Sequence, residues 1–357
     1  MIEEIPDILP QSLAPHDAVI DVRSPAEFAE DHIPGAINLP VLSNEERAVV
    51  GTIYVRESRF RARRLGAAHV ARNVAAHLGG ALSTRDAKFR PLLYCWRGGM
   101  RSNAMATILS QIGWRVGVLK GGYKTWRRAV VAQLFDEKTP LNLVLIDGET
   151  GAAKTDILRQ MASMGVQTID LEGLAAHKGS VFGGEADRPQ PPQKLFESRL
   201  FDRLRALDPA APIVVEAESS RIGRIVLPKR LWASMRTAPR LVIRAEAAAR
   251  ARYLVDAYAD LIASAGEAAL AIERLAPFHS KERIAEWQAL AGAGRHVALA
   301  ETLMLQHYDP LYLRSRKRAG SVLLGEIRLD RLEADDIAGA AAAAADLVSR
   351  ASRRSPP

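Results

Sequence analysis

At 357 residues, with 48% hydrophobic and 25% charged side chains, the chain has an ordinary globular composition, which excludes disorder throughout and favours two domains over one core. The opening MIEEIPDILP is acidic, which argues against a secretory signal, and the single cysteine excludes an internal disulfide. No apolar run approaches the roughly 18 residues that span a bilayer. We therefore expect a cytoplasmic protein without membrane contact. A formal net charge of +8 favours polyanionic partners.

The first part of the chain alternates short apolar runs with helix-like segments, as an α/β layer structure does. Ala18–Asp21 and Pro91–Tyr94 are predicted as buried strands. Residues 134–142, LFDEKTPLN, form a polar stretch that contains a proline and is typical of a linker. We therefore predict one domain over residues 1–135 and a second over residues 136–357.

A short stretch of predicted helix, VRESRFRARRLG, is crowded with arginine. Its basic residues are Arg56, Arg59, Arg61, Arg63 and Arg64. Taken alone, such a run is more often a solvated helix face than a binding site. Contact with the phosphates of a nucleic acid is the alternative, and it depends on what the rest of the chain shows.

The stretch PLLYCWRGGMRSNAMATILSQIGW predicts a buried strand, a glycine-containing turn that starts at Cys95, and an amphipathic helix. This order points backbone N–H groups and a helix N-terminus at the sulfur, and Arg97 and Arg101 add positive charge that favours the nucleophilic thiolate. Gly98 and Gly99 allow the backbone to curl around a phosphate-like anion. A lone cysteine is usually a small buried hydrophobe, but here the context favours a catalytic loop formed by Cys95, Arg97 and Arg101.

Two flanking motifs resemble the rhodanese superfamily. VIDVRSPAEFAEDHIPGAINLP, residues 19–40, is similar to its opening motif, and LKGGYKTW, residues 119–126, is similar to its glycine-rich closing motif. The resemblance implies architectural roles for Asp21, Arg23 and His32. CWRGGMR has five residues between cysteine and arginine, one more than many rhodaneses, and resembles the Cys-x5-Arg loop of phosphatases. A tetrahedral anion should therefore fit, and plain thiosulfate sulfurtransferase activity becomes less favoured.

The second part of the chain has Val- and Ile-rich runs at 143–146, 166–170, 213–215 and 241–243, separated by helical patterns, which predicts a parallel sheet. After about Gly325 the chain becomes rich in alanine, which predicts a helix followed by a basic tail.

NLVLIDGETGAAKTDILRQM has the strand, loop and helix order of a P-loop. The predicted phosphate-binding residues are Gly148, Gly151, Lys154 and Thr155. Ala153 stands where the pattern has glycine, and an ordinary strand-to-helix connection is the alternative. The Thr155 hydroxyl can meet Mg²⁺, and no other metal site is predicted. Glu216 and Glu218 resemble the acids that end a Walker B strand, or simply pair with Arg221.

A rhodanese-like domain followed directly by a P-loop domain resembles the tRNA 2-selenouridine synthase family. The stretches PVLSNEERAVVGTIY, CWRGGMRS, DLEGLAAHKGSVFG (170–183) and HYDPLY (307–312) are similar to signatures of this family. The resemblance implies conversion of 2-thiouridine at the tRNA wobble position to 2-selenouridine through an S-geranyl intermediate. Geranyl diphosphate and selenophosphate are the implied co-substrates, with no tightly bound cofactor.

On this reading Cys95 carries selenium, the P-loop holds donor phosphates, and the arginine stretch contacts tRNA. Trp96 is equally suited to stacking on a base and to packing. Two other functions stay open: a Cys-dependent phosphatase fused to a small-molecule kinase, and a non-enzymatic tRNA-binding sulfur carrier.

Overall fold

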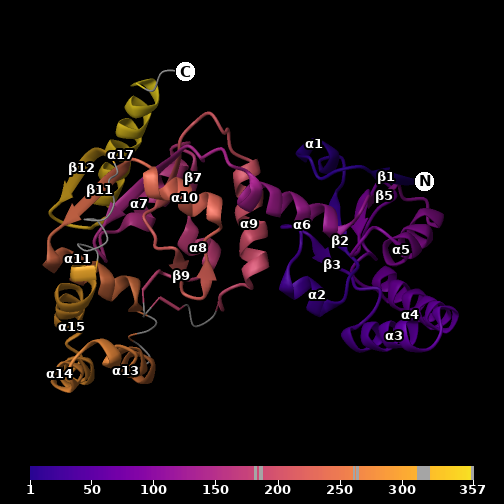
Figure 1. Cartoon of the computed structure of the whole chain (residues 1–357), viewed down its shortest axis with the longest axis horizontal. Helices are drawn as coiled ribbons and strands as arrows, with labels where there is room; N and C mark the ends of the chain where they lie inside the picture. The colour runs from indigo at the N-terminus through magenta and orange to yellow at the C-terminus, as the bar shows by residue number, and fades with distance from the viewer. Residues whose placement is uncertain (181–182, 185–187, 260–261, 263–264, 312–321, 355–357) are drawn as a thin grey trace. The chain divides into compact units, whose positions relative to one another are not determined.

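The structure is a computed structural model that describes residues 1–180, 183–184, 188–259, 262, 265–311 and 322–354 (Figure 1). Parts of three predicted features lie outside these residues: positions 181–182 of the DLEGLAAHKGSVFG stretch, Tyr312 of HYDPLY, and the last three residues of the basic tail. The chain divides into two compact units. Unit 1 comprises Met1–Asp136 and Pro192–Asp202, and unit 2 comprises Glu137–Pro191 and Arg203–Pro357.

Unit 1 is built on a five-stranded parallel sheet with the order β1-β5-β4-β2-β3. Its strands are β1 (Ile2–Ile5), β2 (Ala18–Asp21), β3 (Ile37–Asn38), β4 (Pro91–Tyr94) and β5 (Val116–Leu119). Its helices are α1 (Pro10–Leu13), α2 (Pro25–Glu30), α3 (Asn44–Arg56), α4 (Arg59–Gly79), α5 (Met100–Gln111) and α6 (Tyr123–Val131), which a π-helical turn (Ala132–Asp136) extends. The two predicted strands, β2 and β4, are confirmed and are neighbours in the sheet.

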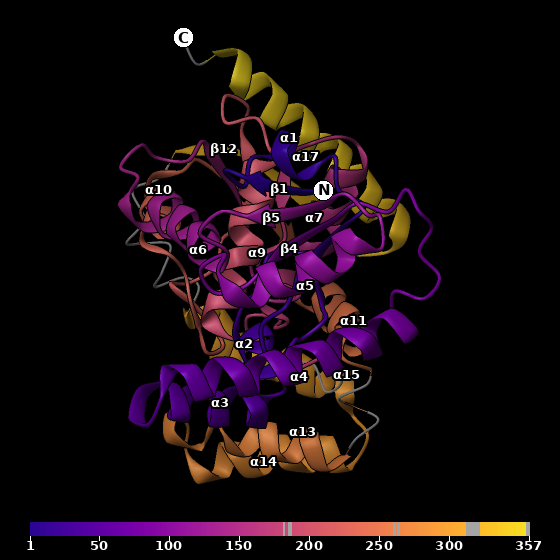
Figure 2. The same ribbon diagram turned by 90° about the vertical axis from the view of Figure 1, so that its right-hand side faces the viewer.

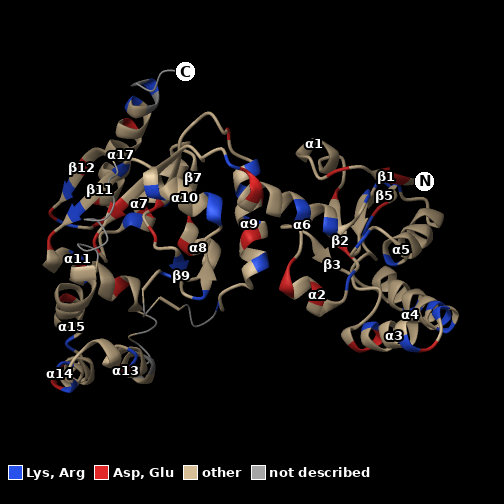
Figure 3. Ribbon diagram, in the orientation of Figure 1, with Lys and Arg blue, Asp and Glu red and all other residues tan. Residues whose placement is uncertain are grey.

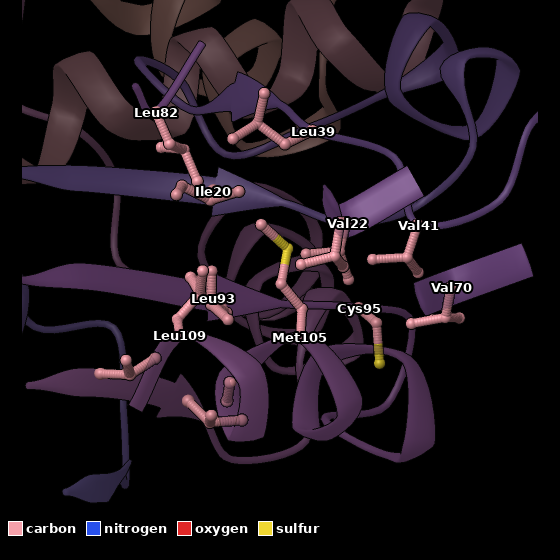
Figure 4. Packing of buried hydrophobic residues seen from close by; sticks show 14 of the residues in the cluster. Ile20, Val22, Leu39, Val41, Val70, Leu82, Leu93, Cys95, Met105 and Leu109 are labelled. Atoms are coloured by element: carbon pink, nitrogen blue, oxygen red, sulfur yellow. The ribbon is translucent and has the colours of Figure 1, made fainter. Parts of the chain in front are cut away.

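The core of unit 1 forms where α4 and α5 pack on the sheet. Val70 and Val74 of α4 and Met105 and Leu109 of α5 join buried residues of the strands in one apolar cluster, part of which is drawn in Figure 4. Ile20 and Leu93 are completely buried because parallel strands are covered on both faces.

A segment distant in sequence completes unit 1. The first ten residues of α9 (Gln193–Arg205) group with this unit, although the rest of the helix does not. The indole of Trp126, which is fully buried, donates to the Ser198 hydroxyl at 2.9 Å and packs edge-on against Phe201. Arg127 forms an ion pair with Glu197. Burial of the Trp126 indole, with its N–H satisfied, explains why this segment belongs to unit 1.

Unit 2 contains a second five-stranded parallel sheet, with the order β12-β11-β6-β8-β7. Its strands are β6 (Leu143–Gly148), β7 (Thr168–Ile169), β8 (Ile213–Glu216), β11 (Arg240–Ala245) and β12 (Leu323–Leu329), with a small hairpin of β9 (Arg221–Ile222) and β10 (Ile225–Val226). Its helices are α7 (Lys154–Ser163), α8 (Leu171–Ala175), α10 (Lys229–Thr237), α11 (Ala247–Ala257), α13 (Ala265–Glu273), α14 (Lys281–Gly292), α15 (His296–Leu303) and α17 (Ala334–Arg354), with a 3-10 turn (Ala276–Phe278) and a π-helical turn (Met304–Tyr308).

The α/β class and the parallel sheet of the second part are confirmed. β1, β3 and β5 of unit 1 and β12 of unit 2 were not predicted. β12 contains Glu326 and Arg328 and alternates between exposed and half-buried residues, so it lacks the apolar run that marks a buried strand. It forms the sheet edge beside β11. The alanine-rich helix is confirmed as α17, whose Ala340, Ala341 and Ala344 are buried beside α7. No helix in the described ranges is both long enough and apolar enough to cross a membrane.

Candidate active site

The cysteine loop connects the end of β4 to the start of α5. Cys95 follows Tyr94 directly and is only 3% exposed. Its Sγ accepts hydrogen bonds from the Gly99 N–H at 3.2 Å and from the Ser102 hydroxyl at 3.3 Å. Figure 4 shows Cys95 in the same apolar cluster as Met105 and Val70. The sulfur therefore sits between an apolar core and a set of hydrogen-bond donors.

The donors outweigh burial in setting the ionisation of this thiol. Burial by itself raises the pKa of Cys95. Hydrogen bonds from the Ser102 hydroxyl and from the backbone N–H groups of Ser102, Arg97 and Gly99 outweigh it, so the pKa is lowered. The thiolate is thus favoured by the start of α5, as the strand, turn and helix order predicts. Sequence reasoning missed Ser102, although its position in the first turn of a helix after the cysteine was a usable signal.

The two predicted arginines have different positions from those the sequence suggested. The Arg97 side chain is exposed, and this residue acts on the sulfur through its backbone N–H. The Arg101 guanidinium forms a two-pronged ion pair with Glu27, at 2.7 Å to Oε2 and 3.3 Å to Oε1. The expectation that both guanidinium charges lower the pKa of Cys95 is therefore replaced by a hydrogen-bond explanation. Their catalytic roles stay predictions.

The glycine-rich closing motif packs directly against the cysteine loop. The Tyr123 N–H donates to the Cys95 carbonyl at 2.8 Å, and the Lys124 N–H donates to the Trp96 carbonyl at 3.2 Å. A Cβ on Gly122 would lie 2.2 Å from the Cys95 carbonyl oxygen, and one on Gly98 would lie 2.5 Å from the Leu119 oxygen. Both glycines have positive φ, so a side chain is excluded by conformation as well as by space.

A buried polar network supports the same loop from the other side. Asp21 and Arg23 form a fully buried ion pair at 2.6 Å, and Arg23 also donates to the Asp31 carbonyl. The Tyr123 hydroxyl donates to the Asp31 carboxylate at 2.6 Å. His32 is held through Nδ1 by the Phe28 carbonyl at 2.8 Å and stacks on the Phe28 ring. These contacts fit the architectural roles that the resemblance implied.

Trp96 lies in the cysteine loop and is 39% exposed. Its ring is 5.2 Å from that of Tyr123 in a tilted arrangement. One part of the indole thus packs on the closing motif, while another part is open to solvent.

The second loop, in unit 2, joins β6 to α7 and has a P-loop shape despite Ala153. Ala153 adopts a left-handed conformation with φ 53° and ψ 28°, the region that glycine normally supplies. This conformation costs about 1–2 kcal/mol for a residue with a Cβ. The loop geometry is therefore kept at a cost in stability, and the alanine does not replace it with a different turn.

Lys154 and Thr155 begin α7 at the mouth of this loop. The Lys154 ammonium donates to the Gly148 carbonyl at 2.9 Å and to the Glu149 carbonyl at 3.2 Å. The Thr155 hydroxyl donates to Glu172 at 3.0 Å. Gly151 has φ +81°, and a Cβ there would meet the Leu254 side chain at 2.9 Å. The structure thus brings Gly148, Gly151, Lys154 and Thr155 together.

Carboxylates gather beside Thr155 because the carboxyl ends of β6, β8 and β7 lie at one edge of the sheet, and Glu172 follows β7. The carboxylate that contacts Thr155 is Glu172, a residue that was not singled out from the sequence. Glu216 is fully buried and accepts from the Leu171 N–H at 3.0 Å. Burial and the charge of Asp170 raise its pKa. Burial and the nearby Glu172 carboxylate raise the pKa of Glu218 to about 7.

The P-loop opens into a cleft of about 1390 Å³ in unit 2. The cleft is lined by residues of α11 and the position just after it (Tyr253, Leu254 and Tyr258) and by His307 and Tyr308 of the HYDPLY stretch. Asp309 of that stretch forms a two-pronged ion pair with Arg250 at 2.8 and 3.0 Å, and Arg250 donates to the Thr150 carbonyl. The stretch therefore stabilises the P-loop from outside it. Among the described residues, no group of three or more His, Cys, Asp or Glu is arranged to hold a metal ion.

The arginine stretch is not one helix, as predicted, but the tip of a helical hairpin. α3 ends at Arg56, and α4 begins at Arg59 after Ser58, whose hydroxyl accepts from the Arg61 N–H. Figure 2 shows the two helices side by side, and in Figure 3 the ribbon at one end of the pair carries the blue of Lys and Arg. All five arginines are exposed, and Arg61 pairs with Glu57 at 2.6 Å. Tyr54, Val55 and Phe60 are exposed on the same tip.

The fold and the two loops define a two-domain protein in which a rhodanese-like domain with an activated cysteine accompanies a P-loop domain. The family described as "Rhodanese-like domain" matches residues 6–129, and "tRNA 2-selenouridine synthase AAA domain" matches residues 141–285. A tRNA 2-selenouridine synthase of Psychromonas ingrahamii is 31% identical over 305 residues, covering 85% of this chain and 81% of that protein. Another, from Bdellovibrio bacteriovorus, is 31% identical over 357 residues, covering 88% and 92%. The chain belongs to the tRNA 2-selenouridine synthase family.

Ser102 provides a direct test of how the thiolate is stabilised. Ser102→Ala removes the hydroxyl that donates to Sγ, so the pKa of Cys95 should rise and the thiolate fraction at neutral pH should fall. The pH profile of alkylation by iodoacetamide reports this thiol alone, because the chain has one cysteine. The profile should move to higher pH, whereas Ser110→Ala on the same helix should leave it in place. An unmoved profile for Ser102→Ala would contradict the assignment.

Gly98 and Gly99 form a matched pair for testing the loop geometry. Gly98→Ala forces a Cβ against the Leu119 carbonyl at positive φ and should destabilise the protein by about 2 kcal/mol. Gly99→Ala meets no atom within 4 Å and should cost much less. Urea unfolding followed by tryptophan fluorescence measures both. Equal losses of stability would show that the tight packing at Gly98 is not what constrains the loop.

Proposed function

We propose that this protein converts 2-thiouridine at the wobble position of tRNA to 2-selenouridine, by S-geranylation followed by replacement of the S-geranyl group with selenium. Geranyl diphosphate and selenophosphate are the proposed co-substrates, with no tightly bound cofactor. The observation that carries the proposal is the pairing, in a member of this family, of a single activated cysteine with a phosphate-binding loop.

Alkylation has a clear physical purpose in this scheme. The thiocarbonyl sulfur of the base is a poor leaving group, and a geranyl substituent makes it leave more readily. We assign selenium transfer to Cys95, whose lowered pKa keeps it reactive near neutral pH. We expect the loop from Cys95 to Arg101 to accept a tetrahedral anion such as selenophosphate, because its cysteine-x5-arginine length resembles the loop of phosphatases.

We assign the P-loop to the diphosphate of the prenyl donor. Diphosphate is the leaving group of the alkylation, so positive charge from Lys154 stabilises negative charge that grows in the transition state. The loop's N–H groups recognise phosphate and not a base, so a prenyl diphosphate can occupy them without a nucleoside. If Mg²⁺ accompanies the diphosphate, Thr155 and Glu172 are the residues placed to hold it.

The hairpin tip of α3 and α4 is the proposed tRNA contact in unit 1. Three features of it suit a polyanion: five exposed arginines, exposed Tyr54 and Phe60 among them, and no acidic residue in the first turn of α4. Arginine at a helix N-terminus is unfavourable for the helix, because the dipole there is already positive. That cost is offset if the tip binds phosphates.

Two variants should show which loop carries out geranylation and which carries out selenium transfer. Cys95→Ser should abolish 2-selenouridine while sparing geranylation, and Lys154→Ala should lose geranylation first but still convert tRNA that is already S-geranylated. Nucleoside mass analysis of tRNA incubated with each variant and each donor separately measures both products. Normal selenium incorporation by Cys95→Ser would refute the cysteine assignment. An ATP requirement in the wild type, with geranylation retained in Lys154→Ala, would assign the P-loop to a nucleotide.

Charge reversal tests the tRNA contact. Arg63→Glu with Arg64→Glu should weaken tRNA binding at low salt and reduce the slope of log K against log salt by about 1–2, since each lost phosphate contact removes roughly 0.7–0.9. The matched control is Arg85→Glu with Lys88→Glu, which are exposed in the same unit and change the net charge equally. If both pairs change the slope alike, the tip has no specific role.

A further inference from the structure

Glu27 on α2 occupies a central position beside the cysteine loop. Its Oε2 accepts hydrogen bonds from the Ser24 N–H at 3.1 Å and from Arg101 Nη1 at 2.7 Å, and its Oε1 accepts from Arg101 Nη2 at 3.3 Å. Arg47 of α3 approaches the same carboxylate at 4.0 Å. Glu27 thus links the first turns of α2, α5 and α3.

This carboxylate is ionised and partly removed from water. Burial raises the pKa of Glu27, but hydrogen bonding and attraction from Arg101, the Ser24 N–H and the charge of Arg23 lower it overall. The side chains of Glu27 and Arg101 are only 22% and 16% exposed. A two-pronged pair with this burial restricts the guanidinium to one orientation, unlike an exposed ion pair.

Arg101, whose guanidinium is held in one orientation, lies next to a residue that contacts the cysteine. Arg101 is the second residue of α5, and the next residue, Ser102, donates to the Cys95 sulfur. A guanidinium has five N–H donors, and Glu27 takes one from each terminal nitrogen, so three stay available. Because Arg47 and Arg101 both lie against one carboxylate, the group around Glu27 keeps net positive charge.

We propose that Glu27 is a positioning residue that holds Arg101 at the rim of the cysteine loop, so that Arg101 recognises the tetrahedral anionic group of the donor that reacts at Cys95. The inference rests on the proposed function of that loop. Glu27 acts through Arg101 and does not touch the reacting atoms. The thiol itself is outside its influence, since the donors that lower the pKa of Cys95 are Ser102 and backbone N–H groups.

The test uses the full chain, inorganic phosphate as the probe anion and alkylation of the single cysteine as the readout. Phosphate bound in the loop should protect Cys95 from iodoacetamide. Glu27→Gln keeps a side chain that can complete the capping box at the start of α2 but loses the charge that holds Arg101. The phosphate concentration for half-protection should rise about tenfold, which corresponds to about 1.4 kcal/mol. The pH profile of alkylation without phosphate should stay unchanged.

The matched control is Glu30→Gln, on the same helix, which removes an ion pair with Lys194 and should behave as the wild type does. Arg101→Lys alone and combined with Glu27→Gln completes a double-mutant cycle, and the combined loss should be smaller than the sum. The inference is overturned if Glu27→Gln and Glu30→Gln act alike, if the losses add, or if phosphate fails to protect the wild type. None of these outcomes depends on selenium transfer, so the proposed function is tested separately by Cys95→Ser.

Discussion

Close backbone packing between the cysteine loop and the glycine-rich turn after β5 is the constraint on which unit 1 depends. Gly98 and Gly122 approach so closely that a Cβ on either would overlap a backbone atom of the other segment. The Tyr123 N–H satisfies the Cys95 carbonyl, while the N–H groups of Arg97 and Gly99 are directed at the sulfur. The lowered pKa of Cys95 follows from the Ser102 hydroxyl and from the backbone N–H groups of the loop and the start of α5, and not from a nearby cationic side chain.

Unit 2 uses the same principle with different chemistry. A buried parallel strand ends, a glycine-containing loop follows, and the first turn of a helix supplies donors, here with Lys154 in addition. Ala153 accepts a left-handed conformation to keep this shape, and Arg250 and Asp309 hold the loop from outside. In each unit the predicted binding groups are mostly backbone, so the strands and helices that fix the backbone determine the shape of the loop.

The negative charge of the carboxylates around both loops is reduced, by paired arginines in unit 1 and by raised pKa values in unit 2. Glu27 lies against two arginines, and Asp21 is neutralised by Arg23. Beside the P-loop, burial raises the pKa of both Glu172 and Glu218. Repulsion from Asp170 adds to the rise for Glu172, and repulsion from Glu172 adds to it for Glu218.

The sequence by itself determined the α/β class, the strands with unbroken apolar runs, and both loops with Cys95 and Lys154 in them. It could do so because a buried strand, a turn and a helix start are local patterns. Only the tertiary structure decided what depends on distant segments: the pairing of Arg101 with Glu27, the contact of Thr155 with Glu172, the role of Ser102, and the return of residues 192–202 to unit 1. β12 escaped notice because an edge strand needs no continuous apolar run. Contacts between residues far apart in the chain have no characteristic sequence spacing, because sheet order and packing determine which residues meet.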